Sequence, residues 1–351
     1  MGVNFALLAL ITMMSLSFLK GQRVLHKFEG KTLSDARVSI KPPSTSLSRH
    51  EWTELAQQHR SSMERLLYPD EGVCRSMLTL KERRHAVDKH PIYNFLHTYY
   101  RYSAESLMKY SPGPGVQLLG TDKRDFSSSG LLHPKFFTVQ QKYCAIENEF
   151  TGKHKLDIFR RNHELLRSTI DKQPLFSCYG LHEWAMLYRG HEKHQKQLGL
   201  RVSQETIDRV VEEQPLRCTH FDAYRFFSPD AKPLNAIELD RAAQLKKEQP
   251  GCIHATMDLF KYAYTVYPLV SSNLLRDCLK IAFTARYIDM RASPYAVHAF
   301  EGCEYPISVE TEEGRALYAK EQEALLVASK PIRARLLAAY DVIALELAMA
   351  R

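Results

Sequence analysis

The spacing of apolar residues along this chain predicts a protein built from helices. Apolar side chains recur every three or four positions over long stretches, which is the period of an amphipathic helix. The first such stretch is Glu51–Leu67, and a second runs from about Cys74 to Val87. His90-Pro91 opens a third, because proline is favoured in the first turn of a helix.

The carboxyl-terminal half shows the same period. Long amphipathic helices are predicted over Ser272–Arg291, Thr311–Ala328 and Pro331–Arg351, and the proline separates the last two. Asn235, with a glutamate three residues later, has the spacing of a capping box, which predicts a helix over 235–248.

Residues 111–150 interrupt this helical pattern. They contain SPGPG and SSSG and two short β-like runs, VQLL and KFFTV. Turn-forming residues between short apolar runs are typical of hairpins and irregular loops. We therefore expect an all-α, compact, bundle-like domain of many helices over residues 50–351, with a small irregular or β-ribbon insertion near 111–150.

The amino-terminal residues are expected to lie outside this domain. Phe5–Leu19 is an apolar run that is shorter than the roughly 20 residues of a membrane span, and its length fits the core of a signal peptide. The following residues are basic and contain no acid up to Lys27, as in organelle transit segments. We assign residues 1–28 to a targeting leader or anchor for a plastid or secretory route, and the polar residues 29–49 to a linker.

Composition narrows the class of protein. Hydrophobic residues make up 44% and charged residues 25%, with a mean hydropathy of −0.34, which argues against a polytopic membrane protein. The net charge of +8 comes from 48 basic and 40 acidic residues, largely interleaved, so contact with DNA is permitted but not required. Seven cysteines without a CxxC pair indicate free thiols in a reducing compartment.

The most informative feature is a pattern that occurs three times. It reads FSCYGLHEWAMLYR, RCTHFDAYRFF and GCIHATMDLFKYAY. Each time a cysteine precedes a histidine, and a carboxylate follows that histidine within four positions. The pairs are His182 with Glu183, His220 with Asp222, and His254 with Asp258.

Three imidazoles that converge in space could hold a divalent metal ion. His254 and Asp258 are four residues apart on a predicted helix and share a face, so Asp258 could be a fourth ligand or could orient an imidazole. Three histidines with an open position suit catalytic zinc, and two histidines with a carboxylate suit non-haem iron. A di-iron centre would need further carboxylates, for which Glu147 and Glu149 are available. The predicted metal ligands are His182, His220 and His254, and the candidate catalytic groups are Asp258, Glu183 and Asp222.

Aromatic and basic side chains of the same segments are candidate substrate contacts. They could form a pocket in which a planar ligand or an extruded base stacks, or they could pack in the core. HPIYNFLHTYY offers a further set, His90, Asn94 and His97, either as core or as pocket lining. The candidate substrate-binding residues are Trp184, Tyr188, Tyr224, Arg225 and Tyr262.

Several segments together resemble a family of bacterial and algal proteins that are often labelled 3-methyladenine DNA glycosylase. The segments are HPIYNFLHTYY, SPGPGV, FSCYGLHEWAMLYR, RCTHFDAYRFF, QPGCIHATMDLFKYAY and DMRASPY, in the order of that family, over roughly residues 50–345. The resemblance implies a DNA base N-glycosylase in which Asp222, Asp258 or Glu183 activates water and aromatic rings clamp a flipped base. DNA would then be the partner.

Three functions therefore stay open. The favoured one is a metal-dependent oxygenase or hydrolase, of the iron or zinc type, that acts on a small or aromatic substrate. The second is the DNA N-glycosylase, and the third is a helical binding protein whose histidines are structural. The absence of GxGxxG, Walker A and GxSxG motifs argues against dinucleotide, P-loop and α/β-hydrolase chemistry.

Overall fold

The computed structural model describes most of the chain. The described residues are 37–38, 45–68, 90–127, 130–133, 137–140, 143–146, 148–149, 153–191 and 197–349, with isolated positions at 82, 85, 87, 88 and 195. The predicted leader over 1–28 and most of the helix predicted from Cys74 lie outside these residues. Within the described part, no helix combines the length and the apolar character that crossing a membrane requires.

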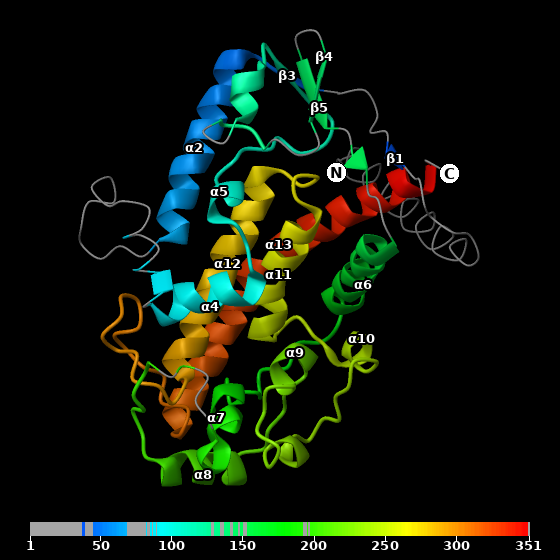
Figure 1. Ribbon diagram of the computed structural model, residues 1–351. Coiled ribbons are helices and arrows are strands. Elements are labelled where there is room, and N and C mark those ends of the chain that lie inside the picture. The colour runs from blue at the N-terminus through cyan, green and yellow to red at the C-terminus, as the bar shows by residue number, and fades with distance from the viewer. Residues whose placement is uncertain are drawn as a thin grey trace, which may run out of the picture.

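The predicted all-α architecture is confirmed (Figure 1). The α-helices are α2 (Arg49–Leu67), α4 (Pro91–Tyr100), α5 (Ala104–Leu107), α6 (Lys153–Ile170), α7 (His182–Leu187), α8 (Gln204–Glu213), α9 (Phe221–Tyr224), α10 (Gln244–Lys247), α11 (Ile253–Val266), α12 (Ser272–Ala292) and α13 (Glu312–Met349). Short 3-10 helices cover Lys123–Phe126, Tyr188–Gly190 and Lys232–Leu234.

Helices α11 and α12 form the centre of the molecule. They are consecutive, antiparallel and side by side, and α13 packs against both (Figure 1). Most side chains of α11 are buried, as expected for a helix that is covered on nearly every side. Because a short loop joins α11 to α12, the start of α11 and the end of α12 lie at the same end of the pair.

Helix α13 runs through the proline at which we predicted two helices to separate. Pro331 lies inside one continuous helix, so the predicted break between Ala328 and Pro331 is wrong. The reason is the position of the ring on the helix. Pro331 is exposed, whereas the buried residues Ser329 and Arg333 beside it continue the packed face.

The helix predicted over 235–248 is also wrong in most of its length. Only Gln244–Lys247 is helical, as α10. Asn235 caps no helix. Its side-chain oxygen accepts the N–H of Cys218, and its amide nitrogen donates to the carbonyl groups of Cys218 and Ile237. It therefore stabilises a loop.

The insertion near 111–150 contains the predicted ribbon. β3 (Val116–Leu119), β4 (Phe137–Gln140) and β5 (Tyr143–Ile146) form antiparallel pairs, with β5 in the middle. β2 (Thr45–Leu47) adds to β3 in parallel, so the segment predicted as a linker ends in a strand and in the capping residue of α2. A separate antiparallel pair joins β1 (Arg37–Val38) to β6 (Asn148–Glu149).

Candidate metal centre

The three cysteine–histidine segments meet in the structure. His182 is the first residue of α7, His220 precedes α9 as its capping residue, and His254 lies in the first turn of α11. The ring centroids of His182 and His254 are 4.2 Å apart, and those of His220 and His254 are 5.5 Å apart. The imidazoles therefore share one region of the core.

The turn before α11 sets the position of His254. The side-chain oxygen of Gln249 accepts the N–H groups of Gly251 and Leu175 and so ties this turn to the segment that leads to α7. A side chain at Gly251 would meet Gln249 at 2.9 Å and Pro174 at 3.0 Å. A larger residue at this position would displace the Gln249 side chain or crowd Pro174, so glycine fits best where the chain enters the helix that carries His254.

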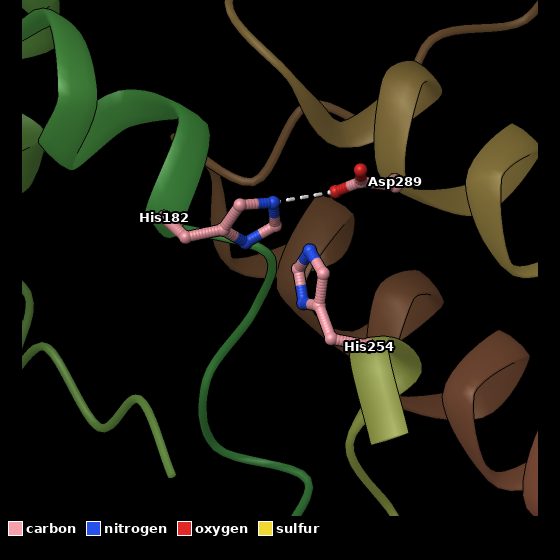
Figure 2. Close-up of side chains that lie close together, drawn as sticks. All are labelled: His182, His254 and Asp289. Carbon is pink, nitrogen blue, oxygen red and sulfur yellow. Dashed lines mark ion pairs between the residues drawn. The ribbon is translucent and has the colours of Figure 1, made fainter. Parts of the chain in front are cut away.

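A third ligand candidate comes from α12 rather than from the segment that carries His220. His182, His254 and Asp289 each offer one donor atom, and these atoms all lie within 4.8 Å of one another. Figure 2 shows the three side chains approaching one point from three different helices. Together they could hold a metal ion.

The contact between His182 and Asp289 has the geometry of neighbouring metal ligands. Nε2 of His182 lies 2.8 Å from Oδ1 of Asp289, yet neither atom has a hydrogen-bond partner among the described residues. Two ligand atoms at 2.0–2.1 Å from one ion, at nearly right angles, would be about 3 Å apart. Both atoms are buried and face each other as an ion pair without good hydrogen-bond geometry, and a bound ion would satisfy both of them.

The protonation states suit metal binding. Burial and the neighbouring His182 hold the pKa of His254 well below its usual value, which leaves its ring neutral with a free lone pair. Burial opposes ionisation of Asp289, but His182 and the guanidinium of Arg286 outweigh it and hold the pKa of Asp289 below its usual range. A neutral imidazole and a carboxylate are the forms that bind metals.

His220 is occupied elsewhere, so it does not complete the predicted set of three histidine ligands. Its Nδ1 accepts the N–H of Ala223, which caps α9, and its Nε2 lies 3.3 Å from Asp258 and 3.7 Å from Glu248. Although burial opposes protonation, these two carboxylates raise the pKa of His220. Asp258 was predicted either to bind the metal or to orient an imidazole. In the structure its carboxylate contacts the imidazole of His220 and not that of His254 on its own helix.

The three candidate catalytic carboxylates are all paired with cations. Lys261 bridges Asp222 at 3.1 Å and Asp258 at 3.3 Å. Glu183 accepts a hydrogen bond from Nη1 of Arg286 at 3.0 Å. Glu147 lies outside the described residues, and Glu149 belongs to β6. Asp222, Asp258 and Glu183 therefore form ion pairs in the walls of the candidate centre.

A cavity of about 250 Å³ opens beside the candidate metal centre. His182, His254, Glu183 and Arg286 line one part of it. Helix α4 supplies much of the remainder, so the HPIYNFLHTYY segment contributes to the pocket through residues other than its histidines. The other lining residues are Asn94, Phe95, Thr98, Tyr99, Tyr100, Met186, Gln195, Gln197, His220, Asp222, Ala223, Phe226, Met257 and Asp258.

None of the five predicted substrate-binding residues is among the described residues that line this cavity. Trp184 is fully buried and donates to the carbonyl of Ala292, and Tyr188 donates to Glu212. Tyr262 packs behind Asp258, with its hydroxyl 3.5 Å from that carboxylate. The other two are Tyr224, which packs against Phe227, and Arg225, which pairs with Asp222.

Sequence reasoning missed Arg286 and Asp289, although a signal was present. Both lie on the predicted helix Ser272–Arg291, in register with the buried residues Leu275, Leu279 and Ala282. An arginine and an aspartate three residues apart on the apolar face of a helix are rarely buried without a partner. That anomaly could have marked them as candidate site residues.

The chain matches no protein-family model, and no curated protein or solved structure is significantly similar to it.

Proposed function

We propose that this protein is a metal-dependent enzyme in which His182, His254 and Asp289 hold a divalent ion. The observation that carries the proposal is the pair of buried, unsatisfied atoms, Nε2 of His182 and Oδ1 of Asp289, with the ring of His254 beside them. Two histidines and one carboxylate leave coordination positions for a substrate or water. The ion would be non-haem iron or zinc.

The bound ion would supply Lewis acidity or would activate water or dioxygen. This chain's own residues would do the rest. Both histidines line the cavity, so a substrate there would lie next to the ion. Arg286 would hold Asp289 ionised and in place, and the Lys261–Asp258–His220 network would fix the opposite wall.

The same geometry gives less support to the DNA N-glycosylase. A carboxylate that activates water needs a free oxygen within reach of that water. Asp258 and Asp222 are both paired with Lys261, so only Glu183 among the three candidates has a buried oxygen, Oε2, without a hydrogen-bond partner among the described residues. Release of methylated purines from alkylated DNA by the purified protein would reverse this ranking.

The decisive experiment compares two aspartates on the same helix. Asp289→Asn keeps the size of the side chain but removes its charge, and we expect at least about a 10-fold loss of affinity for the metal. The matched control is Asp277→Asn, because Asp277 forms an exposed ion pair with Arg335 on α13 and should leave metal binding unchanged. Titration of iron(II) and of zinc into metal-free protein provides the measurement.

Two results would overturn the proposal. One is wild-type protein that takes up neither metal in stoichiometric amount. The other is a folded Asp289→Asn variant, shown by circular dichroism to be native, that binds the metal as tightly as the wild type.

A further inference from the structure

Arg286 presents two unused donors at the cavity. Its side chain is 1% exposed and lines the cavity, and its Nη1 donates to Glu183 and Asp289. Its Nε and Nη2 have no hydrogen-bond partner among the described residues. Leaving a buried charged donor unpaired is costly, so this arrangement points to a ligand.

The unused donors form one edge of the guanidinium group. Nε–H and Nη2–H are parallel, and two such donors match the two oxygens of a carboxylate. The orientation of that edge is fixed, because Nη1 is bound on the other side and the ring of Phe95 lies 3.8 Å from the guanidinium carbon. The hydroxyl of Tyr100, also buried, unpartnered and on the cavity wall, is a further donor.

The charges around Arg286 favour an anion once the proposed ion is bound. Arg286 contributes one positive charge, and Glu183 and Asp289 contribute one negative charge each. A divalent ion between neutral histidines would leave the group with a single net positive charge. One monoanionic ligand would neutralise it. This step depends on the proposed function, whereas the unpaired donors do not.

The rest of the cavity fits an apolar or aromatic body. Phe95, Tyr99, Phe226, Met186 and Met257 contribute its apolar wall. Its volume of about 250 Å³ lies below the range of drug-sized ligand sites, so the ligand is small. We infer that the substrate is a small carboxylate with an aromatic or apolar body, whose carboxylate is bound by the Nε–Nη2 edge of Arg286 and by Tyr100.

The test uses two probes of nearly the same shape, the anion phenylacetate and the neutral phenylacetamide. Calorimetric titration of the metal-loaded wild type should show phenylacetate binding at least about 10-fold more tightly, because hydrogen bonds from a charged donor to a charged acceptor are strong. Arg286→Lys keeps the positive charge but loses the paired donors, and it should remove most of that preference. Arg291→Lys, on the same helix but bound to Glu321, is the matched control and should retain it.

The wild-type comparison and Tyr100→Phe keep the inference testable if Arg286→Lys fails to fold. Tyr100→Phe should weaken phenylacetate binding more than phenylacetamide binding, because the hydroxyl donates a stronger hydrogen bond to the charged carboxylate. Equal binding of the two probes, no binding of phenylacetate, or an unchanged preference in folded Arg286→Lys would overturn the inference.

Repeating the titration on metal-free protein separates this inference from the proposed function. A chain that takes up no metal but still prefers phenylacetate would overturn the metal enzyme and support the carboxylate site. A metal-loaded chain without the preference would overturn the carboxylate site alone.

Discussion

Buried histidines of this protein differ in charge according to what surrounds them. His220 lies between two carboxylates, which raise its pKa. His59 and His90 are buried without such partners, and burial lowers the pKa of each to about 4. The same residue type thus serves as a cation in one place and as a neutral group in another.

His59 should make the protein less stable in mild acid. The unfolded chain takes up a proton near pH 6.5, whereas folded His59 does so only near pH 4, so unfolding is favoured as the pH falls between these values. Between pH 7 and pH 5 this costs about 2 kcal/mol. His59→Gln keeps a donor for the carbonyl of Leu107 and should lose that part of the pH dependence in urea unfolding.

The control for His59 is an exposed histidine. His298→Gln should leave the pH dependence of the unfolding free energy as in the wild type. A His59→Gln variant with the full wild-type dependence would show that other groups cause it.

Part of the candidate metal centre could be predicted from single residues, and part could not. His182 and His254 stood out because each follows a cysteine in a repeated pattern, and the structure brings them together. Asp289 belongs to no such pattern and becomes a ligand candidate only because the end of α12 meets the start of α11. That meeting is a property of tertiary packing, which local spacing does not encode.

At the scale of helices, local signals succeeded where packing agreed with them. Arg49–Leu67 and Ser272–Ala292 follow the predicted ranges closely, because each has a regular apolar face and a serine cap. The capping-box pattern at Asn235 gave a wrong helix, because the asparagine bonds to a distant loop. The helix break predicted at Pro331 is wrong, because the proline ring faces solvent and does not disturb the packed face of the helix.

Pro331 should still cost α13 some stability. The ring removes one backbone hydrogen bond and crowds the preceding turn. Because Pro331 is exposed, it makes no buried contacts that would offset this loss of stability. Pro331→Ala should therefore raise the free energy of unfolding by about 1 kcal/mol or more, since alanine is the better helix former. Urea denaturation measures this change.

The neighbouring Lys330→Ala, also exposed, is the control for Pro331 and should change stability by less than about 0.5 kcal/mol. Destabilisation by Pro331→Ala would contradict this prediction.

At the scale of the whole molecule, the core of the described part of the chain consists of a large and a small hydrophobic cluster. The large one surrounds α11 and α12 and includes Trp184. The small one lies between α2 and the sheet and includes Trp52, Leu118 and Leu132. The helices that carry the three proposed metal ligands, α7, α11 and α12, all contribute residues to the large cluster.

The two tryptophans of the chain offer a matched test of this division. Trp52→Ala and Trp184→Ala each remove a fully buried ring and should each cost about 3–5 kcal/mol. Only Trp184→Ala should also weaken metal binding, because the indole of Trp184 ties α7 to the end of α12 beside Asp289. Hydrogen exchange and metal titration would measure the two effects, and loss of metal in folded Trp52→Ala would contradict the division.

The proposed ligands lie at positions 182, 254 and 289, on three helices that an unfolded chain does not hold together. An ion that binds only the folded form stabilises it in proportion to the logarithm of its free concentration. Supply of the metal would then govern how much of this protein escapes degradation in a cell. When the metal is scarce, the amount of folded protein would fall first, and the molecules that remain folded would still carry the metal and keep their activity.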